Sequence, residues 1–267
     1  MSARIGPAGI GRSSVPLGTY YAVLIAMLYV PLAILLLFSL TRGGGLSFPL
    51  GPLSLDSYAS VLSSDALLSS ARNSVIVGIG SSTAATALGT MVAILMLRYQ
   101  FRGQRLLVAL AILPLIVPFV VLGVALLVLF RAVGMPLSLW TVGAGHAVVA
   151  IPFVLLIVAA RLNGVDPRLE EAAMDLGATY PVTLVRVVLP IIAPALVSAW
   201  LTAFTVSFDE FALALFLAGP SPTFPVYLYS QLRFASRFPI LIAMAVLLMI
   251  GTLALVLVAE RIRRLRT

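Results

Sequence analysis

Long apolar runs alternate with short polar segments along the whole sequence. Six runs stand out, at residues 20–40, 74–97, 106–130, 141–160, 191–217 and 239–259. Roughly 20 apolar residues in a helix cross the ~30 Å hydrocarbon core of a bilayer. We therefore expect an all-α membrane protein with six transmembrane helices. The run at 20–40 is longer than a signal-peptide core and no small-residue cleavage site follows it, so we expect it to remain as an uncleaved first helix.

The composition indicates that lipid is the main solvent of this chain. Hydrophobic residues make up 61% of it and charged residues only 10%, whereas soluble domains carry about 25% charged residues. Too few polar side chains remain to cover a water-soluble globule. No repeat or linker divides the sequence, so we expect one transmembrane domain over residues 1–267.

The residue types that are missing exclude several kinds of chemistry. All 17 basic residues are arginine, cysteine is absent, and His146 is the only histidine. Without lysine the chain has no P-loop for ATP hydrolysis, and without cysteine it has no ligand set for a Cys/His zinc site. We expect no metal, cofactor or catalytic residue in this chain. The net charge of +8 suggests nucleic acid, but arginines placed between apolar runs are typical of membrane topology instead.

The distribution of arginine predicts the orientation of the helices. With six spans, both termini lie on the same side of the membrane. If that side is the cytoplasm, twelve arginines lie inside, and the five outside are Arg42, Arg72, Arg131, Arg233 and Arg237. Positive residues favour the cytoplasmic side. We therefore expect cytoplasmic termini and a cytoplasmic loop at residues 161–190.

This loop contains the signals of a short helix. Asp166 followed by Pro167 is typical of an N-cap with proline at the first helical position. Gly177 can take the left-handed conformation that ends a helix. We expect a helix of about ten residues between them and a second one that starts near Thr179 or Pro181. Pro190, with Pro194 after it, is expected to break the entry into the fifth span.

The predicted loop helix has two chemically different sides. Leu169, Ala172, Ala173 and Leu176 make one side apolar. Glu171 and Asp175, four residues apart, make another side acidic. Such a helix suits a groove on another protein, although a solvated loop helix without a partner would look the same.

The loop resembles a family signature. It has Glu171-Ala172-Ala173, Gly177, Val187, Leu189 and Pro190 at the spacing found in permease subunits of binding-protein-dependent ABC importers, with valine where isoleucine is commoner. Asn73-Ser74 and Arg98, at the two ends of the second span, are also similar. The resemblance covers a core of roughly residues 60–260. It implies the type I ABC importer permease fold.

The resemblance also implies partners. Residues 167–176 would form a coupling helix that sits in a cleft of a separate ATP-binding subunit. The residues implied in this coupling are Glu170, Glu171, Ala172, Ala173, Asp175, Leu176, Gly177, Leu189 and Pro190. The implied partners are two ATP-binding subunits that hold ATP and magnesium, a second and different permease chain, and an extracytoplasmic substrate-binding protein. The chain itself would be a non-enzymatic subunit in a bacterial cell membrane.

An acidic pair lies inside the fifth apolar run. Asp209 and Glu210 follow Ser207, toward the outer half of that span. A carboxylate is costly in hydrocarbon, so the pair should face protein or water. Two interpretations remain: an acidic point on the path of a cationic cargo, or an ion pair with an arginine at the outer rim (Arg72, Arg131 or Arg233).

The same stretch is similar to the second permease subunit of spermidine/putrescine importers. The matching residues are Ser207, Asp209, Glu210, Phe216, Gly219-Pro220, Pro225 and Ser230. Relatives that carry opines, aminoethylphosphonate or iron share this pattern. Polyamine is thus the favoured cargo, the other solutes remain alternatives, and Ser207, Asp209 and Glu210 are the expected residues of the substrate path.

Two other classes of protein fit less well. A secondary transporter acting alone usually has more spans, or repeats with a charged relay near the midplane. An intramembrane enzyme needs converging catalytic groups, and His146 is the sole imidazole. His146 is either a proton relay or, as is commoner, hydrogen-bonded to a neighbouring helix. Pro114 and Pro118 predict a kink in the third span.

Overall fold

The computed structural model describes residues 17–41 and 51–264. Over these ranges the chain is almost entirely helical, and its one β pairing is an isolated bridge between Thr41 and Leu53. The predicted membrane orientation depends partly on Arg42 and on the two chain termini. These residues lie outside the described residues.

A helix is present at each of the six expected spans. These helices are α1 (Leu17–Ser39), α3 (Asp65–Arg98), the pair α4 (Gln104–Ile116) and α5 (Phe119–Ala132), α6 (Leu139–Asn163), α9 (Leu189–Asp209) and α12 (Phe238–Arg264). Shorter helices are α2 (Asp56–Leu62), α7 (Arg168–Asp175), α8 (Tyr180–Thr183), α10 (Ala212–Leu217) and α11 (Phe224–Gln231). The all-α prediction is confirmed.

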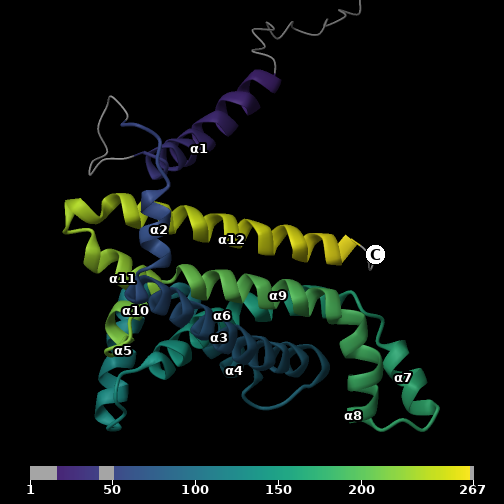
Figure 1. Ribbon diagram of the computed structural model, residues 1–267. Coiled ribbons are helices and arrows are strands. Elements are labelled where there is room, and N and C mark those ends of the chain that lie inside the picture. Colours follow the sequence, from purple (N-terminus) through teal and green to yellow (C-terminus); the bar gives the residue numbers. More distant parts are fainter. Residues whose placement is uncertain (1–16, 42–50, 265–267) are drawn as a thin grey trace, which may run out of the picture.

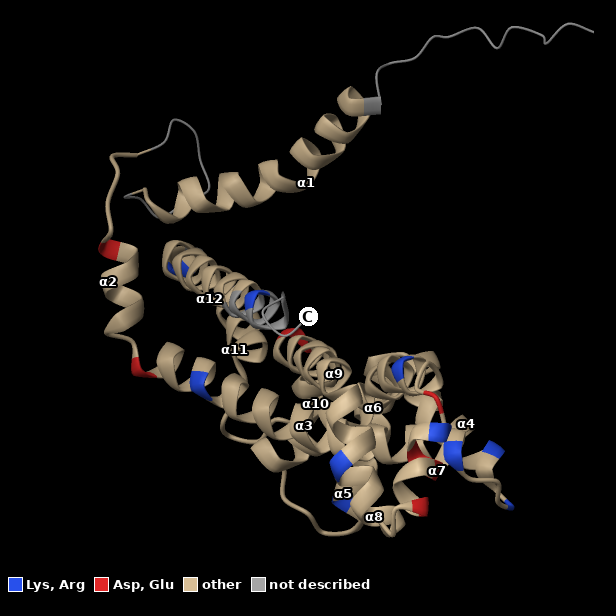
Figure 2. Ribbon diagram, turned by 90° about the vertical axis from the view of Figure 1, so that its right-hand side faces the viewer, with Lys and Arg blue, Asp and Glu red and all other residues tan. Residues whose placement is uncertain are grey.

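Not every span has the same length. Four stretches are each long and apolar enough to cross a bilayer, namely α1, α3, α6 and the continuous helical stretch Tyr180–Asp209. The α4–α5 pair adds a fifth if it is counted as one span. The described apolar part of α12, Phe238–Ala254, is shorter. Charged residues lie mainly near helix ends and loops, and α1 carries none (Figure 2).

The core of the bundle lies where α3, α6 and α9 pack together (Figure 1). Small residues are fully buried at these contacts, among them Ala85, Ala93, Ala150, Ala199 and Ala203. Small side chains let helix backbones approach closely, which is the main source of packing energy between helices in lipid. In contrast, α1 packs chiefly against α12 and is exposed along most of its length.

The third span is not one helix. It divides into α4 and α5, whose axes differ by 115°. Val117 at the division is extended, with φ −78° and ψ 130°, because the ring of Pro118 disfavours the helical conformation of the residue before it. The expected kink is therefore a complete break, and the prediction of a single helix over 106–130 is wrong.

The fifth span differs from its prediction at both ends. Helical structure runs without a break from Tyr180 to Asp209, so Pro190 does not interrupt the helix as expected, although the helix axis turns sharply between α8 and α9 (Figure 1). A π-helical turn, Leu184–Val188, precedes α9, and the N–H of Leu189 donates to the carbonyl of Leu184, five residues back. This wider turn accommodates Pro190, which has no N–H and would clash with a carbonyl in a regular helix.

At the other end of this span, α9 stops early. Glu210 is extended, with φ −72° and ψ 118°, and the short helix α10 begins at Ala212. The predicted helix over 191–217 is thus two helices. The α10 segment packs against α5 and α6, so the bend after Asp209 redirects the chain into the bundle.

Gly89 provides a test of the packing between α3 and α6. A Cβ atom at Gly89 would lie 2.7 Å from Cγ1 of Val154 and 3.1 Å from the carbonyl oxygen of Ile151. Gly89→Ala should therefore push the helices apart and lower the thermal midpoint of the purified protein, since overpacking costs about 1–3 kcal/mol. Gly80→Ala is the matched control on the same helix, because nothing lies within 4 Å of its Cβ position. Equal midpoints for the two variants would contradict the close packing.

Candidate functional site

The helix α7 begins and ends where the loop sequence predicts. Oδ1 of Asp166 accepts a hydrogen bond from the backbone N–H of Arg168 at 3.0 Å. Gly177 has φ +90°, its N–H donates to Met174 at 2.9 Å, and the N–H of Ala178 donates to Ala173 at 3.1 Å. These bonds satisfy free groups at both ends of the helix. The prediction for Gly177 is confirmed, whereas the helix begins one residue later than predicted, with Pro167 at the N-cap position and Arg168 as its first residue, and α7 is shorter than ten residues.

Glu170 and Glu171 lie in different surroundings. Glu170 is buried, 6% exposed, and its Oε1 accepts a hydrogen bond from Nε of Arg98 at 2.7 Å. Arg98 also donates to the carbonyls of Leu162 and Val165. The ion pair therefore ties α7 to the ends of α3 and α6. Glu171 is exposed and is free to meet a partner.

The remaining predicted coupling residues fall into two groups. Ala172, Asp175, Leu176 and Gly177 are exposed and Ala173 is half-buried. Leu176 is 90% exposed, and the neighbouring Leu169 and Met174 are also exposed. This is an apolar surface at the tip of a loop. Leu189 and Pro190 lie apart from it at the start of α9, where Leu189 packs against the helix core.

The predicted substrate-path residues separate at the bend between α9 and α10. Ser207 and Glu210 are buried, while Asp209 is exposed. The carboxylate of Glu210 accepts hydrogen bonds from the N–H of Leu213 at 2.9 and 3.0 Å and from the N–H of Ala214 at 3.0 Å. Glu210 thereby caps α10. The three residues do not share one surface.

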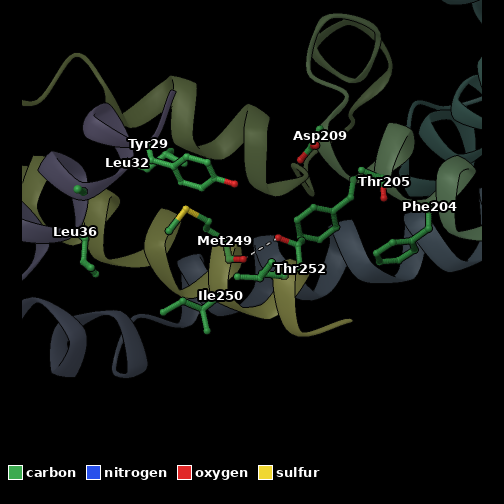
Figure 3. Close-up of a pocket in the computed structure, with 12 residues that line it drawn as sticks. Tyr29, Leu32, Leu36, Phe204, Thr205, Asp209, Met249, Ile250 and Thr252 are labelled. Carbon is green, nitrogen blue, oxygen red and sulfur yellow. Dashed lines mark hydrogen bonds between the residues drawn. The ribbon is translucent and has the colours of Figure 1, made fainter. Parts of the chain in front are cut away.

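Asp209 lines a groove of about 630 Å³ between α1, α9 and α12 (Figure 3). The other lining residues are Tyr29, Leu32, Ala33, Leu36, Phe204, Thr205, Phe208, Met249, Ile250, Thr252 and Leu253. Asp209 is the one charged residue among them, and the walls are otherwise largely apolar and aromatic. Trp200, Phe204 and Phe208 stack along α9 with ring centroids 5.5 and 5.7 Å apart. A carboxylate beside aromatic faces is suited to an organic cation.

The acidic pair does not form the ion pair with an arginine at the outer rim that was the second interpretation of the sequence. Within residues 17–41 and 51–264, Asp209 forms no ion pair, and Arg72, Arg131 and Arg233 bond to neither carboxylate. The group facing Glu210 is instead His146, whose Nε2 lies 3.4 Å from Oε2 of Glu210. Sequence reasoning missed this contact because 64 positions separate the two residues and nothing local connects them.

Residues 85–266 match the family described as binding-protein-dependent transport system inner membrane component. The chain belongs to this family. It is therefore a multi-pass membrane permease subunit of an ABC importer, which is a transporter component.

Two relatives and one solved structure agree with this assignment. The chain is 34% identical over 244 residues to the spermidine/putrescine transport system permease protein PotC of Haemophilus influenzae, covering 91% of this chain and 94% of that protein. It is 34% identical over 214 residues to the putrescine transport system permease protein PotI of Escherichia coli K12, covering 77% and 76%. A bacterial ABC transporter that imports alginate has the same fold, with a TM-score of 0.73, 16% identity and 93% of each chain covered.

In this permease, the ion pair between Arg98 and Glu170 should be needed for a stable loop. Arg98→Gln leaves a buried carboxylate without its partner, which costs about 3 kcal/mol. We expect a lower thermal midpoint of the purified protein. The exposed Arg102, on the same side of the molecule, supplies the control variant Arg102→Gln, which should change the midpoint little.

A double substitution separates loss of the pair from loss of packing. Arg98→Gln combined with Glu170→Gln removes both charges, so the midpoint should recover part of the way toward the unmodified protein. A double variant no more stable than Arg98→Gln alone would contradict a pairing role.

Proposed function

We propose that this chain is one of two different permease subunits of an ATP-driven importer that carries polyamines such as spermidine or putrescine. The observation that carries the proposal is the carboxylate of Asp209, which is exposed in an aromatic and apolar groove and forms no ion pair within residues 17–41 and 51–264. An ammonium group can pair with the carboxylate while its methylene chain lies against apolar walls. The relatives named for spermidine and putrescine, similar over most of the chain, support the same cargo class.

The proposed partners follow from the exposed loop. Two ATP-binding subunits would hold ATP and magnesium, and each would receive a coupling helix such as α7 through the exposed Leu169, Leu176 and Glu171. An extracytoplasmic binding protein would deliver the cargo on the opposite side. This arrangement requires the loop and both chain termini to lie in the cytoplasm, as the arginine distribution predicts.

The helical stretch from Tyr180 to Asp209 suggests how the loop drives transport. Helical structure is continuous over its 30 residues, but the axis turns sharply between α8 and α9 (Figure 1). Closure of the ATP-binding subunits would shift α7 and α8 and, through this turn, tilt α9, which carries Asp209 at its far end. The cavity would then open to the other side of the membrane.

Reconstitution tests the cargo. The chain, its partner permease and the ATP-binding subunits are placed in liposomes with the loaded binding protein, and uptake of labelled putrescine and spermidine is measured with and without ATP. We expect ATP-dependent uptake that excess unlabelled polyamine abolishes. Competition by aminoethylphosphonate or an iron complex instead would assign another cargo. Uptake by the chain alone without ATP would indicate a secondary transporter and overturn the proposal.

Gly177 tests the coupling role of the loop. Its φ of +90° strains any side chain, so Gly177→Asp should misplace α7 and abolish ATP-driven uptake while membrane insertion stays normal. Gly164→Asp is the matched control in the same loop, because Gly164 has φ −87° and open space except for a 3.5 Å contact to a carbonyl. Normal ATP-dependent uptake by the Gly177→Asp variant would contradict the proposed coupling role of the loop.

A further inference from the structure

Four buried polar side chains meet at the bend between α9 and α10, and we call them the polar clasp. They come from α3, α6, the end of α9 and the bend itself. The members are Ser81, His146, Ser207 and Glu210. Polar groups buried this deeply in a membrane protein are costly unless they bond to one another. Their convergence therefore indicates a structural or functional role.

Short contacts connect the clasp from one end to the other. Ser81 donates its hydroxyl hydrogen to Oγ of Ser207 at 2.8 Å. Oγ of Ser207 lies 2.8 Å from Nδ1 of His146, and Nε2 of His146 lies 3.4 Å from Glu210. One direction of donation fits the first two contacts: Ser81 to Ser207, and Ser207 to Nδ1, which leaves an Nε2–H on the side of the carboxylate. Nε2 forms no hydrogen bond among the described residues, so its contact with Glu210 at 3.4 Å is electrostatic.

The clasp also determines where Glu210 points. Its two carboxylate oxygens are occupied by the N–H groups of Leu213 and Ala214, and the imidazole covers one of them. The carboxylate is thus held inside the bundle. Asp209 is the preceding residue, at the last turn of α9, and its side chain is exposed in the groove.

We propose that the clasp residues are positioning residues that fix the bend, so that Asp209 alone of the acidic pair meets the cationic cargo. Glu210 and Ser207 act through the backbone of the bend and do not touch the cargo. This inference rests on the proposed function for the nature of the cargo, but the clasp itself does not depend on it.

Two substitutions in the reconstituted importer separate contact from positioning. Uptake of labelled polyamine and ATP hydrolysis stimulated by the loaded binding protein are measured in the same liposomes. Asp209→Asn should lower uptake about tenfold, as expected for loss of one charged contact, with hydrolysis nearly unchanged. Glu210→Gln should lower uptake and hydrolysis together, because the moving bend is disturbed.

Glu210→Asp is the rescue variant. Aspartate keeps the negative charge beside the first N–H groups of α10, where a carboxylate is favoured, so both activities should return to near the unmodified level. Two results would overturn the proposal: uptake lost with hydrolysis preserved in Glu210→Gln, which marks a cargo contact, or a Glu210→Asp variant as defective as Glu210→Gln.

Thermal midpoints of the purified importer complex test the clasp without any cargo. His146→Gln and Glu210→Gln each remove one side of the contact, so together they should lower the midpoint by less than the sum of their separate effects. His146→Gln with Asp209→Asn is the control pair and should be additive. Additivity in both pairs would refute the clasp, whatever the cargo. An importer that fails to carry polyamines but shows the non-additive pair would refute only the cargo.

Discussion

Backbone polar groups in the hydrocarbon core must find partners within the protein, because lipid tails offer none. Uninterrupted helices meet this constraint by themselves, and such helices form most of this chain. The constraint becomes demanding where a helix stops. Two breaks within the described spans, after Ile116 and after Asp209, show different solutions.

At the first break the hydrogen bonds come from the backbone. Val117 donates to the carbonyl of Leu113, Pro118 has no N–H to satisfy, and Leu122 donates to the carbonyl of Pro118. At the second break the N–H groups of Leu213 and Ala214 are buried, and a side chain, Glu210, accepts both. A carboxylate placed there needs polar neighbours in turn. The break in one helix therefore involves side chains from α3 and α6 as well.

Local signals were predictable from sequence, and contacts between distant segments were not. The hydrogen bonds at Asp166 and Gly177 depend on neighbouring residues alone, so they could be predicted from the sequence. The break after Asp209 was missed because apolar residues continue through Leu217 and the cap acts from inside the folded core. The predicted interruption at Pro190 was wrong because a π-helical turn before it accommodates the proline within a continuous helix. This turn has no sequence signature here. The inward orientation of Glu170 required Arg98, 72 positions away.

The two functional regions follow one pattern. In each, a pair of adjacent acidic residues is divided by packing: Glu170 and Glu210 point inward, whereas Glu171 and Asp209 point outward. The inward member is linked to α3 in both cases, directly through Arg98 at the loop and, at the bend, through Ser81, Ser207 and then His146 of α6. These two α3 positions are 17 residues apart, or about 26 Å along the helix. Because α3 is unbroken between them, it offers a continuous route by which a displacement of α7 at Arg98 would reach the residues that we propose orient Asp209.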